Sequence, residues 1–131
     1  QGVRDLCRLE RPGGGSGPGV WVTVAGEVDE LRPSVDAACF RIAQEAVTNA
    51  LRHARRASEV QVRVDGGEDL VRLTVVDDGE SGGASTPTTP GFGLIGMAER
   101  AKLLGGTFAA GPSANGGWTV EATLPRQAAT G

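Results

Sequence analysis

Residues 40–54, with the sequence FRIAQEAVTNALRHA, are the stretch that decides the fold of this chain. At about 3.6 residues per turn, an α-helix over this stretch places polar and apolar side chains on opposite sides. The polar side is unusual, because it aligns a carboxylate, a carboxamide and guanidinium groups where a solvated face usually mixes Lys, Glu and Gln. Such groups suit the binding of a metal–phosphate group and the orientation of a water or hydroxyl toward it. The polar stripe consists of Arg41, Glu45, Asn49 and Arg52, and the apolar side of Phe40, Ala43, Val47, Leu51 and Ala54.

Simpler interpretations of this polar stripe exist. Arg41 and Glu45 are four residues apart and can form an ion pair on a solvated helix face. His53, the only histidine, can be a surface or core imidazole as readily as a phosphate contact. The importance of the stripe therefore depends on what the rest of the chain supplies.

Composition limits which classes of protein this chain can belong to. The 131 residues fit a single domain, and 39% hydrophobic and 22% charged residues are ordinary for a globular chain. The net charge of −3, with acids and bases interspersed, gives no indication of a nucleic-acid or membrane partner. No apolar run approaches the ~18 residues of a transmembrane helix, and no signal peptide is recognisable. Cys7 and Cys39 lack CxxC spacing and are expected as two buried free thiols rather than a disulfide.

Periodicity and turn residues predict the remaining elements. Pro33 and Ser34 begin the central helix, with Asp36 placed favourably for the helix dipole. Strict alternation over residues 58–65 and 70–76, separated by a glycine-containing turn, predicts an antiparallel hairpin. The same reasoning predicts a short helix within residues 2–10, strands at 20–24, 107–110 and 117–124, and a helix over 94–104 that ends at Gly105-Gly106.

Asp77 is the second unusual feature. Alternation along the predicted strand places its carboxylate on the face that carries the apolar residues and should point into the core. Burying this group unpaired is costly, so it requires a fixed donor such as a ligand amine, a backbone N–H or a bound water. Alternatively, Asp77 caps the turn at Asp78 and Gly79.

A long loop follows. Residues 79–90, GESGGASTPTTP, have no periodic apolar positions, as in a functional lid or a disordered insertion. The loop ends in Gly91-Phe92-Gly93 immediately before a predicted helix. Glycines at a helix N-terminus form a typical phosphate site, because backbone N–H groups converge there and the helix dipole favours negative charge. These pieces suggest a nucleotide between the central helix and a mobile lid.

Three motifs, in order, carry a family resemblance. They are RIAQEAVTNALRHA at residues 41–54 (the N box), VVDDG at 75–79 (the G1 box) and GFGLIGMAER at 91–100 (the G2 box and its helix). The chain resembles the ATP-binding catalytic domain of bacterial sensor histidine kinases, of the GHKL (Bergerat-fold, HATPase_c) superfamily, and especially the branch that partners NarL-type response regulators. The resemblance extends from about Val3 to Leu124. Ser81 is a departure, because it stands where the G1 pattern DxGxG has its second glycine.

The resemblance implies a role for each matching residue. Asn49 matches the Mg²⁺ ligand, and Glu45 matches the catalytic residue that polarises the attacking group. Asp77 matches the aspartate that binds the adenine amine, with Gly79 behind the base. The remaining matches are Arg52 and His53, which approach the phosphates, and Gly91, Gly93 and Leu94, which form the hinge of the lid over the triphosphate.

The expected fold is α+β, a two-layer α/β sandwich in which helices pack on one face of a mixed, mostly antiparallel sheet. Residues 1–19 are expected to be a helix or linker remnant from a dimerisation domain that is absent from this chain. Residues 20–125 would form the ATP-binding domain, and residues 126–131 a disordered tail.

The resemblance implies a histidine kinase that binds ATP and Mg²⁺ and donates the γ-phosphoryl group to a histidine on the absent dimerisation domain. The expected partners are that domain and a NarL-type response regulator. We expect a cytoplasmic location, a homodimeric full-length kinase whose membrane anchoring stays open, and a monomeric isolated domain that does not phosphorylate itself. Two alternatives remain: a non-catalytic nucleotide-responsive binding module, and a serine kinase of the anti-sigma type.

Overall fold

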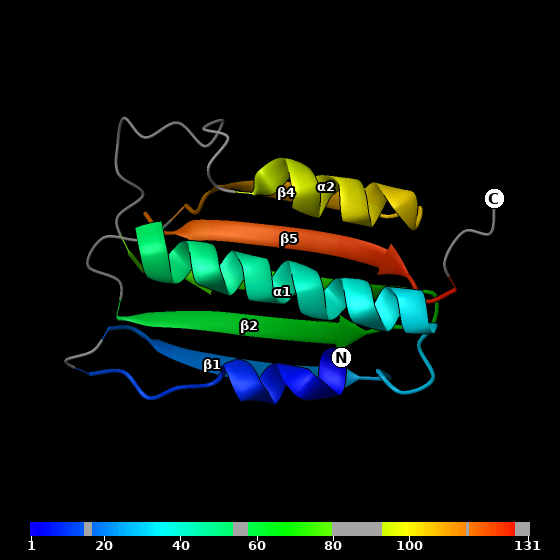
Figure 1. Ribbon diagram of the computed structural model, residues 1–131, viewed down its shortest axis with the longest axis horizontal. Coiled ribbons are helices and arrows are strands. Elements are labelled where there is room, and N and C mark those ends of the chain that lie inside the picture. The colour runs from blue at the N-terminus through cyan, green and yellow to red at the C-terminus, as the bar shows by residue number, and fades with distance from the viewer. Residues whose placement is uncertain (15–16, 54–57, 80–92, 115, 128–131) are drawn as a thin grey trace.

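The computed structural model of the protein describes residues 1–14, 17–53, 58–79, 93–114 and 116–127. Its five-stranded sheet has the order β1-β2-β3-β5-β4, and its helices cover one face (Figure 1). Only β1 and β2 are parallel, and the other neighbours are antiparallel. The predicted two-layer α+β sandwich is therefore confirmed. The elements are η1 (Val3–Leu9), β1 (Gly19–Gly26), α1 (Pro33–His53), β2 (Glu59–Gly66), β3 (Leu70–Asp77), α2 (Leu94–Leu103), β4 (Thr107–Pro112) and β5 (Trp118–Pro125).

Helix α1 divides its two sides as the sequence predicts. It begins at Pro33, carries Asp36 in its first turn and lies across the sheet in Figure 1. No helix in the described part of the chain is long and apolar enough to cross a membrane. The side of α1 toward the sheet supplies much of the core, with Val35, Ala38, Cys39, Phe40, Ile42, Ala43, Ala46, Val47 and Ala50 buried.

The three inner strands complete this core through their alternating side chains. On β2, the buried residues are the valines at every second position, and β3 and β5 follow the same period of two. The registers align these residues in rows across the sheet. The buried rows are Val62–Val75–Val120 and Val64–Leu73–Ala122.

The N-terminal helix η1 packs against α1 and β1. Val3 and Leu6, three residues apart, face the core, as expected where a 3₁₀-helix repeats every three residues. The N–H of Val3 also donates a hydrogen bond to Asp36 of α1 (2.8 Å). Cys7 follows Leu6 and therefore faces away from the core. The expectation that both thiols are buried is wrong for Cys7, which is exposed, whereas burial raises the pKa of the Cys39 thiol to about 12.

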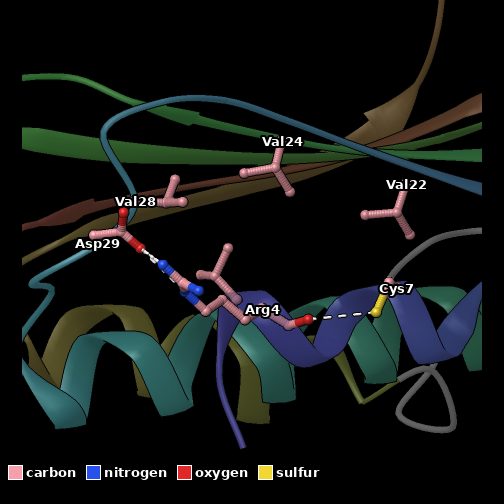
Figure 2. A pocket seen from close by; sticks show the side chains of 7 residues that line it. Arg4, Cys7, Val22, Val24, Val28 and Asp29 are labelled. Carbon is pink, nitrogen blue, oxygen red and sulfur yellow. Dashed lines mark hydrogen bonds and ion pairs between the residues drawn. The ribbon is translucent and has the colours of Figure 1, made fainter.

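An open hollow of about 530 Å³ lies between η1 and β1 (Figure 2). Val22 and Val24 of the strand form part of its apolar wall, and Cys7 lies across from them. Arg4 and Asp29 also line it and form an ion pair with each other. None of the residues that the sequence motifs single out lines this hollow.

Arg126 follows β5 and forms hydrogen bonds to the loop after β1 and to the turn between β2 and β3. Its guanidinium donates hydrogen bonds to the carbonyl groups of Glu27, Asp29 (2.8 Å) and Gly67 (3.1 Å). Its backbone N–H donates to the carbonyl of Asp69 (2.9 Å). Arg126 was expected in the disordered tail, but it belongs to the hydrogen-bonded fold.

Candidate functional site

The end of β3, the end of α1 and the start of α2 lie at the same end of the sandwich. Asp77, the last residue of β3, pairs with Val60 near the start of β2 and with Trp118 at the start of β5. In Figure 1, β2 and β5 begin at the left, where α1 ends and α2 begins. The topology therefore gathers Asp77, the C-terminal turns of α1 and the N-terminus of α2 from three distant parts of the sequence.

Asp77 is the buried polar side chain of the described core, with 5% of its surface exposed. Its neighbour in the β2 register is the fully buried Val60, and one of its oxygens accepts a hydrogen bond from the N–H of buried Gly79 (2.9 Å). This contact is the predicted turn cap. It leaves further lone pairs on the carboxylate for a ligand, because an ionised carboxylate has about four acceptor positions.

The surroundings of Asp77 change its acidity. Burial raises the pKa of this carboxyl above its ordinary value of 3.8, although hydrogen bonds from the backbone N–H groups of Gly79 and Trp118 act in the opposite direction. The nearby charge of Asp78 also raises the pKa. A hydrogen-bond donor from a ligand would relieve part of this unfavourable burial, so the site favours a ligand that presents a donor to Asp77.

The polar stripe of α1 faces away from the sheet. Arg41, Glu45 and Arg52 are exposed, and Asn49 is half-buried. Within the described residues, Glu45 forms no ion pair with Arg41, so the simple surface-pair interpretation is wrong. The carboxylate of Glu45 points elsewhere, toward the start of α2.

Gly93 is where the stripe of α1 meets α2. It is the N-cap residue of α2 and has the left-handed conformation, with φ 66° and ψ 14°. A Cβ at this position would lie 2.4 Å from Glu45 Oε1. The positive φ favours glycine at this position, and a larger residue would also have to displace the Glu45 carboxylate. The N-box stripe and the start of the G2-box helix therefore lie against each other.

The N-terminus of α2 is suited to an anion. Its first-turn N–H groups lack partners within the helix, and its N-cap residue Gly93 provides no side-chain cap. The first turn also contains no acidic residue. Leu94 starts the helix and is half-buried against the core. The helix dipole and these N–H groups thus favour a phosphate near Gly93.

Several predicted features lie outside the described residues. These are Gly91, Ser81 and the lid between Gly79 and Gly93. Of His53, only the backbone at the end of α1 is described, and its part in the site stays a prediction. No cluster of three or more His, Cys, Asp or Glu side chains suited to a metal exists in the described ranges. A Mg²⁺ ion held by one carboxamide and by nucleotide phosphates does not require such a cluster.

Two features beside Asp77 could not be recognised from the sequence. Asp78 was assigned only to a turn, yet its carboxylate accepts hydrogen bonds from Ser58 and Glu59. Gly117 precedes β5, and a Cβ there would lie 2.0 Å from the carbonyl oxygen of Asp77. The adjacent glycines at 116 and 117 signalled a turn, but only the strand register shows which residue they approach.

Comparison with known proteins connects this geometry to a family. Residues 34–128 match the family described as "Histidine kinase-, DNA gyrase B-, and HSP90-like ATPase" (HATPase_c). The chain belongs to this family. Its members are ATPases, so the ligand expected at the site of this ATPase domain is ATP.

Relatives of the ATPase domain come from sensor kinases. The histidine-protein kinase/phosphatase DegS of Bacillus subtilis is 41% identical over 85 residues, covering 63% of this chain and 22% of DegS. The methanol utilization control sensor protein MoxY of Paracoccus denitrificans is 38% identical over 112 residues, covering 82% of this chain and 23% of MoxY. The chain thus spans about a quarter or less of the length of these relatives.

Solved structures share the fold. The blue-light activated histidine kinase of Erythrobacter litoralis EL346 aligns with a TM-score of 0.67 at 25% identity, over 86% of this chain and 37% of that one. The nucleotide-free catalytic domain of histidine kinase ThkA aligns with a TM-score of 0.58 at 15% identity, over 82% and 78% respectively.

We expect Gly93→Ala to lower the free energy of unfolding by about 1–3 kcal/mol, because the new methyl group must adopt a positive φ and displace Glu45. Gly96→Ala is the matched control, since it lies in the same helix and its added methyl group would have no other atom within 4 Å. This control should stabilise the fold by about 0.5–1 kcal/mol. Urea denaturation measures both. Equal effects of the two substitutions would contradict the close contact at Gly93.

We expect Asp77→Asn to gain stability relative to the wild type as the pH rises from about 3 to about 7. Because the folded-state pKa of Asp77 is raised, its contribution to stability is complete below the unfolded pKa and is lost as the pH rises through the folded pKa. Asn cannot ionise and avoids this loss. The measurement is urea denaturation without nucleotide over this pH range.

Asp65→Asn provides a control of opposite sign. The side-chain hydrogen bond from Arg63 lowers the pKa of Asp65, so its contribution appears as the pH rises and is lost on acidification. This difference should be small, since the pair is exposed. A falling stability difference for Asp77→Asn with rising pH would contradict the unfavourable burial of its carboxylate.

Proposed function

We propose that this chain is the ATP-binding domain of a two-component sensor histidine kinase, and that it donates the γ-phosphoryl group of Mg²⁺-bound ATP to a histidine on a dimerisation domain. The proposal rests mainly on one observation: buried Asp77, the polar stripe of α1 and Gly93 lie at the same end of the fold. This fold belongs to the histidine-kinase-like ATPase family. The kinase names of the relatives support it.

Each residue would have a distinct task. The buried Asp77 would accept a hydrogen bond from the adenine amine, and Gly79 would leave room for the base. Asn49 would hold Mg²⁺ together with the phosphates, where the ion neutralises their charge. Arg52 and His53 would lie along the phosphates, and Gly91, Gly93 and Leu94 would form the hinge of the lid.

Glu45 would act on the incoming nucleophile. Its carboxylate is exposed and lies beside the N-terminus of α2, where the phosphates would end. From there it can accept a hydrogen bond from the attacking imidazole and so orient and polarise that ring. Catalysis of phosphoryl transfer depends mostly on such positioning and on electrostatic stabilisation.

The partners follow from the same proposal. The phosphoacceptor histidine would belong to the dimerisation domain of a homodimeric kinase, and the phosphoryl group would then pass to a NarL-type response regulator. The ATPase domain would be monomeric by itself and would act in the cytoplasm.

We expect the chain alone to bind ATP but to incorporate no label from [γ-³²P]ATP, and the parent kinase to become labelled on its dimerisation domain. Glu45→Gln in the parent kinase should reduce labelling by about 10²- to 10⁴-fold while ATP binding persists. Glu121→Gln, an exposed position of β5 on the sheet face away from the helices, should leave labelling unchanged. Stoichiometric labelling of the isolated chain, or full labelling of Glu45→Gln, would overturn the proposal.

A further inference from the structure

Asp78, next to the proposed adenine contact, makes a cluster of hydrogen bonds to the start of β2. One carboxylate oxygen accepts the backbone N–H groups of Ser58 (2.8 Å) and Glu59 (3.1 Å). The other oxygen accepts the hydroxyl of Ser58. We refer to these three bonds as the Asp78 clamp.

The clamp extends the sheet beyond its regular pairing. The β2–β3 register ends at the pair Val60–Asp77, and the Asp78 carboxylate then binds the two N–H groups that precede Val60. The carbonyl of Ser58 in turn accepts the N–H of Gly19, at the start of β1 (3.0 Å). Three strands are therefore joined beside Asp77.

The clamp is retained at neutral pH because Asp78 stays ionised. Desolvation acts to raise its pKa, but the hydroxyl of Ser58 and the N–H groups of Glu59 and Ser58 together hold the pKa below the ordinary value of 3.8. Hydrogen bonds to a charged acceptor are stronger than those between neutral groups.

We infer that Asp78 is a positioning residue for nucleotide binding, which holds the end of β3, with the Asp77 carboxylate, against the start of β2 through its bonds to Ser58 and Glu59. The inference rests on the proposed function, because it concerns the same nucleotide site. Asp78 itself is exposed and acts through the backbone of β2 rather than by touching the ligand.

The test measures the Kd for ADP of Asp78→Ala and Asp78→Asn by calorimetry, below the thermal transition of each variant. Asp78→Ala removes all three bonds. We expect the binding-competent arrangement to be populated about a tenth of the time in this variant, which raises the apparent Kd about tenfold. Asp78→Asn keeps one carbonyl oxygen that can accept both N–H groups, so its Kd should stay within about threefold of the wild type.

A control distinguishes positioning from stability alone. Asp65→Ala removes an exposed ion pair with Arg63 at the other end of β2 and should leave the Kd for ADP unchanged. Amide hydrogen exchange gives a second readout, in which the Glu59 N–H should exchange faster in Asp78→Ala than in Asp78→Asn. If Asp78→Ala does not fold, Ser58→Ala removes one of the three bonds and should raise the Kd about two- to threefold.

The possible failures differ. If the wild type binds ADP and the Kd values of Asp78→Ala and Ser58→Ala equal its own, the positioning role is overturned while the proposed function stands. An Asp78→Asn variant as weak as Asp78→Ala would also overturn it, because the acceptor geometry would not be what matters. If the wild type itself binds no ADP, the proposed function fails and this inference fails with it.

Discussion

The burial of the Asp77 carboxylate is the constraint on which the site depends. A carboxylate on the core side of a central strand destabilises its surroundings unless donors are fixed around it. Here the backbone N–H groups of Gly79 and Trp118 supply part of that compensation, and the pKa of Asp77 nevertheless stays raised. The fold therefore tolerates a group that is unfavourable when no ligand is present, as is common where binding chemistry is located.

Helix α1 connects this carboxylate to the rest of the site. Its apolar side supplies much of the core, so its orientation over the sheet is determined by packing. The opposite side then presents Glu45 to Gly93. Hydrogen bonds from Ser58 to Asp78 join the start of β2 to the end of β3 beside Asp77. The same helix therefore supplies both core residues and site residues. A substitution that shifts α1 in the core should also shift the site.

Local patterns were sufficient to predict the helix, the β2–β3 hairpin and the burial of Asp77, because each follows from periodicity within one segment. Long-range features could not be predicted this way. The parallel pairing of β1 with β2, the contact between Glu45 and Gly93, and the clamp on Ser58 depend on segments that meet only after packing. The exposure of Cys7 was missed because the orientation of a short 3₁₀-helix is decided by which residues contact α1. The roles of the site residues in binding and catalysis remain predictions.

The nucleotide site is tested most sharply by titrating the domain with ATP and ADP, with and without Mg²⁺, for the wild type, Asp77→Asn and Asn49→Ala. We expect that the wild type binds both nucleotides, that Asp77→Asn abolishes binding, and that Asn49→Ala removes the effect of Mg²⁺ on ATP affinity. Absence of binding by the wild type at millimolar nucleotide, or unchanged affinity in Asp77→Asn, would contradict the proposed site.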